Sequence, residues 1–393
     1  MRQPPFGERL PYHCRGAGTW GASTALYLGR RGYTNVVVLD PHPYPSPISA
    51  GNDVNKIAET ISWRPSGGEE DDRVPVETHI AARTSEGWLN DHVFKPYYHD
   101  TGFIAAASTP DAFEFFRQTM PEGVLTGDFP NWKGFWKKRG AGWVHARNAY
   151  VSAAEEAQRL GVRFLTGTPE GKVTGLLYSD SGDVVGVTTA DGKEHHQLLD
   201  FKDQLRPTAW TLAHIKMEPS ELPLYKNLPV LFNVERGFFM EPDEERHELK
   251  ICDEHPGYTN FKGPCHEPAA ESSGSVPFAK HQIPEASEER VRNFLRETMP
   301  QLANRPSLLP GFLIDTHPDH PSLILGVGAS GHGFAHITSI GGFIAIKDAF
   351  RWRPETAVNR DWKDLQGRWG VERRVMDFGE VKEWTDVGDR REC

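Results

Sequence analysis

The sequence predicts an α/β fold of two domains, in which a Rossmann-like dinucleotide-binding domain is interrupted by an inserted α+β domain. Three observations lead to this prediction. With 393 residues, the chain is too long for one compact core. A glycine-rich turn near its start, residues 16–21, precedes a helical pattern and an apolar strand pattern. A second junction between an apolar run and a glycine-rich segment lies at residues 323–342, so both ends of the chain contribute to one domain.

Composition argues against several classes of function. The charged fraction of 25% and hydrophobic fraction of 38% are typical of a water-soluble globular protein. A net charge of −10 without a Lys/Arg stripe argues against nucleic acid or anionic membranes as partners. The longest apolar run, near residues 323–327, is too short to span a bilayer.

The cysteines and the N-terminus favour a reducing, cytoplasmic setting. Residues 1–13 contain no apolar signal region, and the C-terminal Arg391-Glu392-Cys393 is not a peroxisomal address. No spacing among the cysteines suggests a disulfide framework. Cys252 with His255 fits no structural zinc motif, so we expect no metal site. The cysteines are Cys14, Cys252, Cys265 and Cys393.

The turn itself matches the G-x-G-x-x-G fingerprint of dinucleotide-binding folds. Gly16 would permit the tight turn, Gly18 the approach of a pyrophosphate, and Gly21 the close packing of the following helix. A helix is expected over residues 22–31 and a buried strand over residues 35–39. Asp40 ends that strand, where its carboxylate can accept hydrogen bonds from a ribose diol.

The strand that should precede the fingerprint departs from the pattern. Residues 11–15 read PYHCR, and proline and arginine are costly in a central buried strand. We therefore expect this strand to be damaged or replaced. Further along, the pattern predicts helices over residues 149–160 and 286–299, a strand after Gly161, and a hairpin over residues 172–193.

Several long segments resemble one known family, the fungal fructosyl amino acid oxidases, or amadoriases. They stand with the sarcosine, pipecolate and saccharopine oxidases among FAD-dependent enzymes. The segments are GAGTWGASTALYLGRRGYTNVVVLD, SAGNDVNKI, PYYHDTGFI, LKICDEHPGYTNF and FLIDTHPDHPSLILGVGASGHGF. The resemblance implies a FAD-binding domain of the glutathione reductase type. It also implies oxidation of a secondary amine by O2, giving glucosone, a free amino acid and hydrogen peroxide.

The resemblance also implies roles for individual residues. Lys280 would face the flavin and promote its reaction with oxygen, although without the resemblance it would be taken for a surface lysine. The other implied residues are placed at the cofactor: Gly16, Gly18, Thr19, Trp20, Gly21 and Asp40 at its ADP half, and Ser49, Asn55, Lys56, Asp315, Gly331, His332, Gly333 and Phe334 near the flavin.

The chain departs from the family pattern at further places. Residues 305–311, just upstream of Phe312, contain no cysteine at the place where the family links its flavin, so we expect non-covalent FAD. Ala335 replaces a lysine that holds a substrate carboxylate in many relatives. An apolar strand after the hairpin is expected to be deleted near residues 193–201, and residues 344–351 look shortened. Together these suggest an altered gene model or splice form.

The expected FAD-binding domain comprises residues 11–90, 142–205 and 311–393, and the expected substrate domain residues 91–141 and 206–310. The preferred function is oxidation of fructosyl amino acids by a monomer that needs only a glycated amine and O2 as partners. Sarcosine, pipecolate or saccharopine oxidation is the alternative within the class. An impaired paralogue or splice form is the alternative of another class, and a nicotinamide-dependent dehydrogenase is less favoured.

Overall fold

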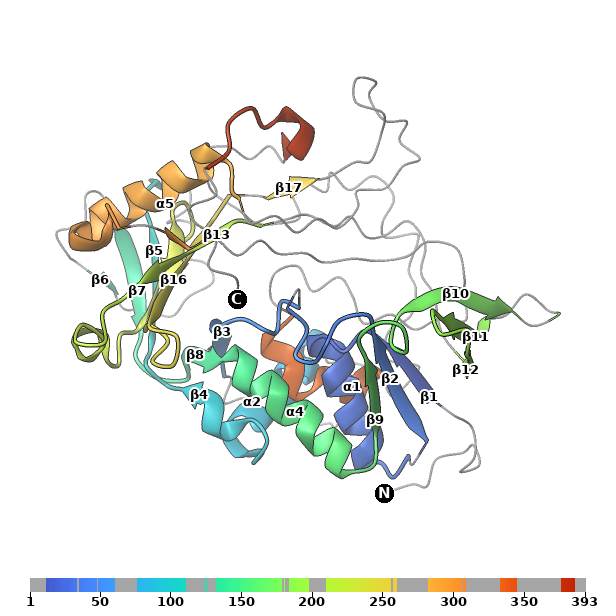
Figure 1. Ribbon diagram of the computed structural model, residues 1–393. Helices are drawn as coiled ribbons and strands as arrows, with labels where there is room; N and C mark the ends of the chain where they lie inside the picture. The colour runs from blue at the N-terminus through green and yellow to red at the C-terminus, as the bar shows by residue number, and fades with distance from the viewer. Residues whose placement is uncertain are drawn as a thin grey trace. The chain divides into compact units, whose positions relative to one another are not determined.

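We describe a computed structural model of the chain, which divides into two compact units (Figure 1). Unit 1 spans residues 1–98, 144–205 and 316–357, and unit 2 spans residues 99–143, 206–315 and 358–393. The described residues are 12–33, 35–47, 49–60, 76–110, 124–125, 132–178, 180, 184–197, 210–255, 257–259, 282–305, 307–308, 333–344 and 376–385.

A parallel sheet forms the centre of unit 1. Its order is β1 (Tyr12–Arg15), β2 (Val36–Asp40), β9 (Arg163–Thr166). Tyr12 pairs with Val36 and Arg15 with Leu39. The expectation that residues 11–15 form no proper strand is therefore wrong. Main-chain groups make the ladder, so the sequence YHCR can still pair along β2.

Two helices pack together beside this sheet (Figure 1). They are α1 (Thr19–Arg30) and α4 (Ala146–Arg159), which confirm the helices expected near residues 22–31 and 149–160. Their contact faces are rich in alanine, which allows a close approach. The fully buried members include Ala22, Ala25, Ala149, Ala153 and Ala157. The segment β1–α1–β2 is thus the expected strand–turn–helix–strand unit.

Shorter elements complete unit 1. β3 (Asn55–Glu59) follows the loop after β2, and α2 (Val76–Asn90) leads into the 3-10 turn η1 (Lys95–Tyr97). Near the other end of the chain lie η4 (Ala335–Thr338) and α6 (Ile340–Ile344). The chain passes between the units through β4 (Tyr98–His99) and β8 (Ala141–His145).

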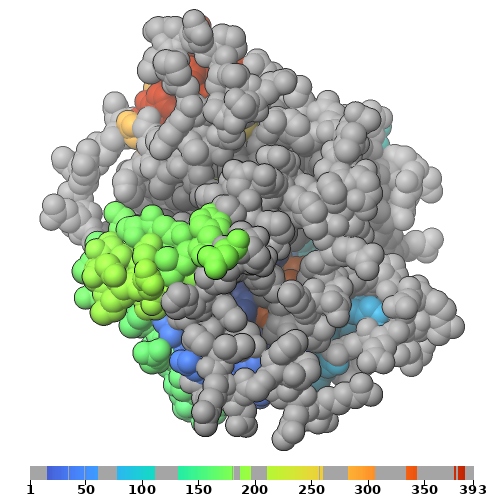
Figure 2. Space-filling model, turned by 90° about the vertical axis from the view of Figure 1, so that its right-hand side faces the viewer, coloured from blue at the N-terminus to red at the C-terminus, as the bar shows by residue number. Residues whose placement is uncertain are grey.

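The expected hairpin forms with a third strand added. β10 (Val173–Tyr178) and β11 (Val184–Thr189) are antiparallel, and β12 (Glu194–Gln197) pairs with the far side of β11. In Figure 2 this sheet forms a continuous green patch on the surface shown. Residues 198–209 lie outside the described part. Within that part, β1 has β2 as its one strand neighbour.

Unit 2 is built on a mixed sheet of eight strands. β14 and β5 are parallel, and the other described pairs are antiparallel. The order is β18 (Ser307–Leu308), β13 (Leu212–Lys216), β16 (Glu248–Asp253), β15 (Gly237–Phe239), β14 (Val230–Asn233), β5 (Phe103–Ala107), β7 (Lys133–Lys137), β6 (Val124–Leu125).

A helix covers part of this sheet and supplies its core. It is α5 (Glu285–Thr298), which confirms the helix expected near residues 286–299. Phe294 of α5 is fully buried and lies 5.4 Å from Phe239 and 6.0 Å from Trp132, measured between ring centroids. Short turns η2 (Leu222–Tyr225), η3 (Pro300–Leu302) and η5 (Phe378–Glu380) complete the unit. This α+β architecture matches the one expected for an inserted domain.

The C-terminal segment differs from the expected division. We expected residues 311–393 to belong with the FAD-binding domain. In the described part, β19 (Met376–Asp377) instead pairs with β17 (Tyr258–Thr259) inside unit 2. The pairing gives β17 the partner that a two-residue strand needs. No helix among the described residues is long and apolar enough to cross a membrane.

Candidate dinucleotide-binding site

The glycine turn joins β1 to α1 in a conformation that requires glycine at two of its positions. Gly16 has φ +96°, and its N–H donates to the Leu39 carbonyl over 2.7 Å. A Cβ added to Gly21 would lie 1.9 Å from the Gly16 carbonyl oxygen. A Cβ on Gly18 would have Ser49 Oγ as its nearest neighbour, at an ordinary 3.5 Å. The protein therefore needs Gly16 and Gly21 for its own fold, whereas its own packing does not require glycine at position 18.

The N-terminus of α1 suits an anion. Among the described residues, no side chain caps its first turn, and that turn contains no acidic residue. The first N–H groups of a helix have no partner within the helix and carry its positive end. The arrangement therefore favours a phosphate next to Gly18 and Thr19.

Asp40 lies beside the turn at the end of β2. Its Oδ2 accepts a hydrogen bond from the Ala17 N–H and its Oδ1 one from the His42 N–H, each over 2.9 Å. The residue is 8% exposed. Each oxygen keeps a second acceptor site. Asp40 therefore fixes the turn and can still accept from a ribose diol, the role that the sequence predicts for it.

The segment 49–56 brings three further predicted residues into unit 1. Ser49 Oγ accepts from the Gly51 N–H over 3.2 Å, and Asn55 is buried in β3. Lys56 pairs with Asp53, whose side chain is fully buried and also accepts from the Val54 N–H over 2.8 Å. Sequence reasoning missed Asp53, because a spacing of three brings side chains together on a helix and this segment leads into the strand β3.

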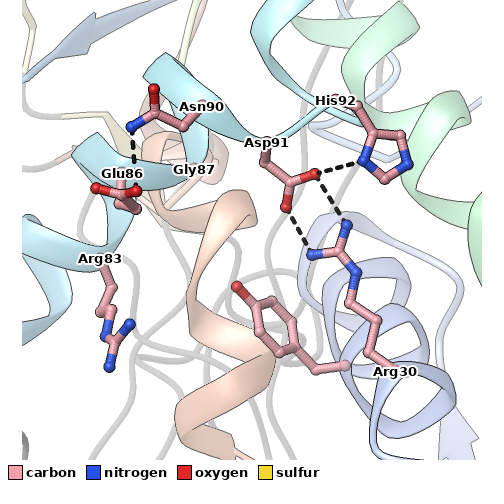
Figure 3. Close-up of a pocket in the computed structure, with 8 residues that line it drawn as sticks. Arg30, Arg83, Glu86, Gly87, Asn90, Asp91 and His92 are labelled. Atoms are coloured by element: carbon pink, nitrogen blue, oxygen red, sulfur yellow. Dashed lines mark hydrogen bonds and ion pairs between the residues drawn. The ribbon is translucent and has the colours of Figure 1, made fainter.

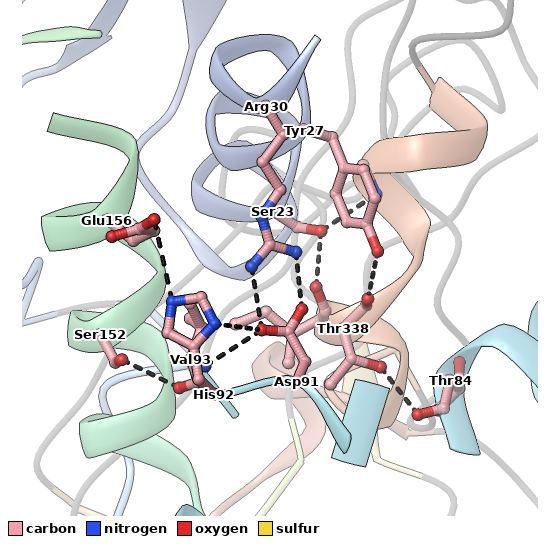
Figure 4. Close-up of polar contacts among 12 residues, drawn as sticks. Ser23, Tyr27, Arg30, Thr84, Asp91, His92, Val93, Ser152, Glu156 and Thr338 are labelled. Carbon is pink, nitrogen blue, oxygen red and sulfur yellow. Dashed lines mark hydrogen bonds and ion pairs between the residues drawn. The ribbon is translucent and has the colours of Figure 1, made fainter. Parts of the chain in front are cut away.

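A segment more than 300 residues away in the sequence lies against α1. Three side chains of α1 donate to backbone carbonyls of residues 333–338: Trp20 Nε1 to Gly333 over 2.8 Å, Ser23 Oγ to Ile337 over 2.6 Å, and Tyr27 OH to Thr338 over 2.7 Å (Figure 4 shows the contacts of Ser23 and Tyr27). Trp88 Nε1 of α2 adds a bond to the Ala335 carbonyl over 2.8 Å. The structure thus brings Gly333 and Phe334 into the same unit as the glycine turn.

Four predicted residues lie outside the described part of the chain: Lys280, Asp315, Gly331 and His332. Their roles stay predictions. Within the described residues, no three or more His, Cys, Asp or Glu side chains are grouped to hold a metal ion. His255, considered earlier for zinc, stacks on Tyr258 with 4.9 Å between ring centroids.

A polar pocket of about 470 Å³ lies at the opposite end of α1 from the glycine turn (Figure 3). Tyr27 and Arg30 of the last turns of α1 line it, together with the end of α2 and residues 91–92. Arg30 donates to both oxygens of Asp91, over 2.6 and 2.9 Å. Burial raises the pKa of Asp91, but the hydrogen bonds from Arg30 and the Val93 N–H, together with the positive charge of Arg30, outweigh it, so the pKa is lowered.

Comparison with known proteins shows to which family this chain belongs. The model of the FAD-dependent oxidoreductase family matches residues 16–345. Amadoriase I from Aspergillus fumigatus, a fructosyl amine:oxygen oxidoreductase, is 48% identical over 99% of this chain and 100% of its own, with a TM-score of 0.84. Amadoriase II, a fructosamine oxidase from the same organism, is 49% identical over 98% and 99%, with a TM-score of 0.83. This chain belongs to the FAD-dependent oxidoreductases and, within them, to the amadoriases.

A more distant relative aligns with this amadoriase-family chain over most of both sequences. The L-saccharopine oxidase of Schizosaccharomyces pombe is 24% identical over 443 aligned residues, covering 93% of this chain and 97% of its own. Because 443 positions exceed the 393 residues of this chain, the alignment places gaps within it.

FAD is the cofactor of this family, and the residues present fit its ADP half. A Cβ on Gly18 would meet nothing closer than Ser49 Oγ at 3.5 Å, α1 begins without a cap among the described residues, and the Asp40 carboxylate lies beside the glycine turn. The lack of a clash at Gly18 suits a pyrophosphate that approaches the backbone, and the uncapped start of α1 suits the negative charge of that pyrophosphate. The Asp40 carboxylate suits a ribose diol.

Proposed function

We propose that this protein oxidises fructosyl amines at the secondary amine, with FAD as cofactor and O2 as acceptor. Identity of 48–49% over almost the whole of both chains to two Aspergillus fumigatus amadoriases carries the proposal. The products would be glucosone, the free amino acid and hydrogen peroxide. The atoms balance when one water hydrolyses the substrate imine and O2 takes up the two electrons and two protons.

The described residues would bind and orient the cofactor. FAD, when bound, supplies the acceptor for a hydride equivalent from the carbon next to the amine nitrogen. The Gly16–Gly21 turn and the start of α1 would hold the pyrophosphate, and Asp40 the adenosine ribose. Lys56, fixed by Asp53, would present a cation to the flavin.

Other parts of the proposal rest on residues outside the described part. Lys280 would stabilise the negative charge that develops on oxygen as it is reduced. We also propose that FAD is held without a covalent bond, because residues 305–311, just upstream of Phe312, contain no cysteine. A cytoplasmic monomer completes the proposal.

Absorbance and peroxide release test the function directly. Purified protein should show the flavin absorbance bands and release peroxide with fructosyl-valine or fructosyl-lysine. Acid precipitation should leave the flavin in the supernatant if it is not covalently bound. A colourless protein that FAD cannot reconstitute would contradict the proposal.

The same measurements separate the alternatives. The relationship to L-saccharopine oxidase makes saccharopine the first competing substrate, followed by sarcosine and pipecolate. An impaired paralogue would release no peroxide with any of them. Thermal unfolding with and without FAD then shows whether such a protein still binds its cofactor, because a ligand of the folded state raises the unfolding temperature.

A further inference from the structure

We propose that Tyr150 is a positioning residue for the ADP half of FAD: its hydroxyl holds the Ala17 carbonyl and thereby turns the Gly18 N–H toward the pyrophosphate. Tyr150 belongs to α4 and is fully buried. Its hydroxyl donates to the carbonyl oxygen of Ala17, a residue 133 positions away within the glycine turn. The inference rests on FAD binding and not on the choice of amine.

The hydrogen bond acts on a peptide group that would face the cofactor. The Ala17 carbonyl and the Gly18 N–H belong to the same planar trans peptide, in which they point in opposite directions. A carbonyl held toward Tyr150 therefore directs the N–H away from the protein core. Asp40 accepts from the N–H of the same Ala17 over 2.9 Å, so both polar groups of this residue are fixed.

Tyr150 is itself held firmly by the loop after β2. The Tyr44 ring lies 4.8 Å from the Tyr150 ring, and the Tyr44 hydroxyl donates to the Tyr150 carbonyl over 2.7 Å. A Cβ added to Gly51 would lie 3.3 Å from Tyr150 Cγ and 2.5 Å from Thr19 Oγ1. The loop thus fits tightly between the Tyr150 ring and the first residue of α1.

The hydroxyl, rather than the ring, distinguishes this role from core packing. Phenylalanine would fill nearly the same space but leave the Ala17 carbonyl without this donor. Because an unpaired buried acceptor is costly, the peptide would rotate more freely toward other donors. Burial raises the pKa of Tyr150, so the phenol stays protonated and can donate throughout the physiological range.

The test compares Tyr150→Phe with Tyr258→Phe in the full-length apoprotein. Tyr258 is equally buried, and its hydroxyl bonds Ser287 Oγ over 3.0 Å in the other unit. Quenching of flavin fluorescence gives the dissociation constant for FAD, and competition gives that for ADP. We expect both constants to rise about tenfold in Tyr150→Phe and to stay unchanged in Tyr258→Phe. At saturating FAD, the flavin spectrum and the kcat of Tyr150→Phe should equal those of the wild type.

Two results would overturn the inference: unchanged binding of FAD and ADP in Tyr150→Phe, or equal losses in both variants. If Tyr150→Phe does not fold, Tyr44→Phe removes the hydroxyl that holds the Tyr150 carbonyl. It should weaken FAD and ADP binding about threefold, and unchanged binding would count equally against the inference. Wild-type protein that binds FAD but releases no peroxide would contradict the proposed reaction and leave the role of Tyr150 testable.

Discussion

In each unit, side-chain contacts hold one helix against the rest of that unit, and the chemistry of these contacts differs between the units. In unit 1, neutral side chains of α1 donate to backbone carbonyls of residues 333–338; we call these contacts the neutral clamp, made by Trp20, Ser23 and Tyr27. In unit 2, Arg290 of α5 binds Asp253 at the end of β16, which we call the charged clamp. The neutral clamp consists of several hydrogen bonds, each of which contributes little to the free energy of unfolding. In the charged clamp, one pair of residues makes the main contribution.

The charged clamp is the more vulnerable of the two. The Asp253 side chain is 2% exposed and accepts from Arg290 Nε over 3.0 Å and from Arg290 Nη2 over 2.8 Å. Thr211 Oγ1 and the His255 N–H also donate to it, each over 3.2 Å. Removing one member of such a network leaves the other donors without their acceptor.

The largest effect is therefore expected for Asp253→Ala. The substitution leaves the Arg290 guanidinium partly buried without its partner, so the free energy of unfolding should fall by about 3–5 kcal/mol. Urea denaturation measures the loss. The control is Glu289→Ala, which removes the exposed pair with Arg296 and should not move the midpoint. Equal urea midpoints for the two variants would contradict this prediction, because they would mean that the charged clamp stabilises the protein no more than an exposed ion pair.

A clash tests how closely the neutral clamp is packed. A Cβ on Gly341 would lie 2.2 Å from the Ser23 carbonyl oxygen, which is backbone and cannot rotate away. A Cβ on the adjacent Gly342 would lie 3.1 Å from the Tyr27 ring, a side chain that can shift. We expect Gly341→Ala to destabilise by about 1–3 kcal/mol in urea denaturation and Gly342→Ala to be nearly neutral. Similar values for the two would mean that α1 and α6 are packed less tightly than described.

The glycine turn of unit 1 could be predicted from the sequence, because its conformation requires particular residue types. Gly16 and Gly21 are needed at their positions by backbone conformation and by a 1.9 Å approach, so the motif itself carried the signal. The same reasoning failed for β1, because pairing with β2 uses main-chain groups and tolerates the sequence YHCR. The motif indicated a helix and a strand but not what holds the turn.

The neutral clamp and Tyr150 could not be predicted for a related reason. Their acceptors are backbone carbonyls of Gly333, Ile337 and Ala17, which any residue provides. A donor and its acceptor more than 100 positions apart leave no spacing to recognise. The charged clamp was in principle easier to find, because Asp253 lies in the CDEHPG segment and Arg290 is on the expected helix.

Within the neutral clamp, Ser23 should show a moderate effect that does not depend on pH. Its Oγ donates to the Ile337 carbonyl over 2.6 Å and accepts from the Gly341 N–H over 3.0 Å. Ser23→Ala should lower the free energy of unfolding by about 1–2 kcal/mol, since two buried groups lose a partner. The loss, measured in urea, should be equal at pH 5 and pH 8 because none of these groups titrates there. A loss that changes with pH would show that the contact is coupled to a charge.

The smallest effect is expected for a charged contact that lies within unit 1. Arg30 of α1 pairs with Asp91, which also accepts from the Val93 N–H over 3.0 Å (Figure 4). Both side chains are partly exposed, at 26% and 15%, so Asp91→Asn should cost less than about 1 kcal/mol near neutral pH. The small cost would show that burial of the carboxylate, which is 2% exposed in Asp253 and 15% in Asp91, makes the charged clamp of unit 2 strong.

The direction in which the pKa of Asp91 is shifted determines how the stabilisation by the Arg30–Asp91 pair depends on pH. The pKa of Asp91 is lowered in the folded protein, so the stabilisation is present above the ordinary value of 3.8 and is lost as the pH falls below it. The difference in stability between wild type and Asp91→Asn, measured by urea denaturation, should therefore be constant from pH 8 to about pH 5 and shrink as the pH falls below 3.8. A difference that stays the same however far the pH falls below 3.8 would show that Asp91 acts through its shape and backbone hydrogen bond, which asparagine disturbs, and not through its charge.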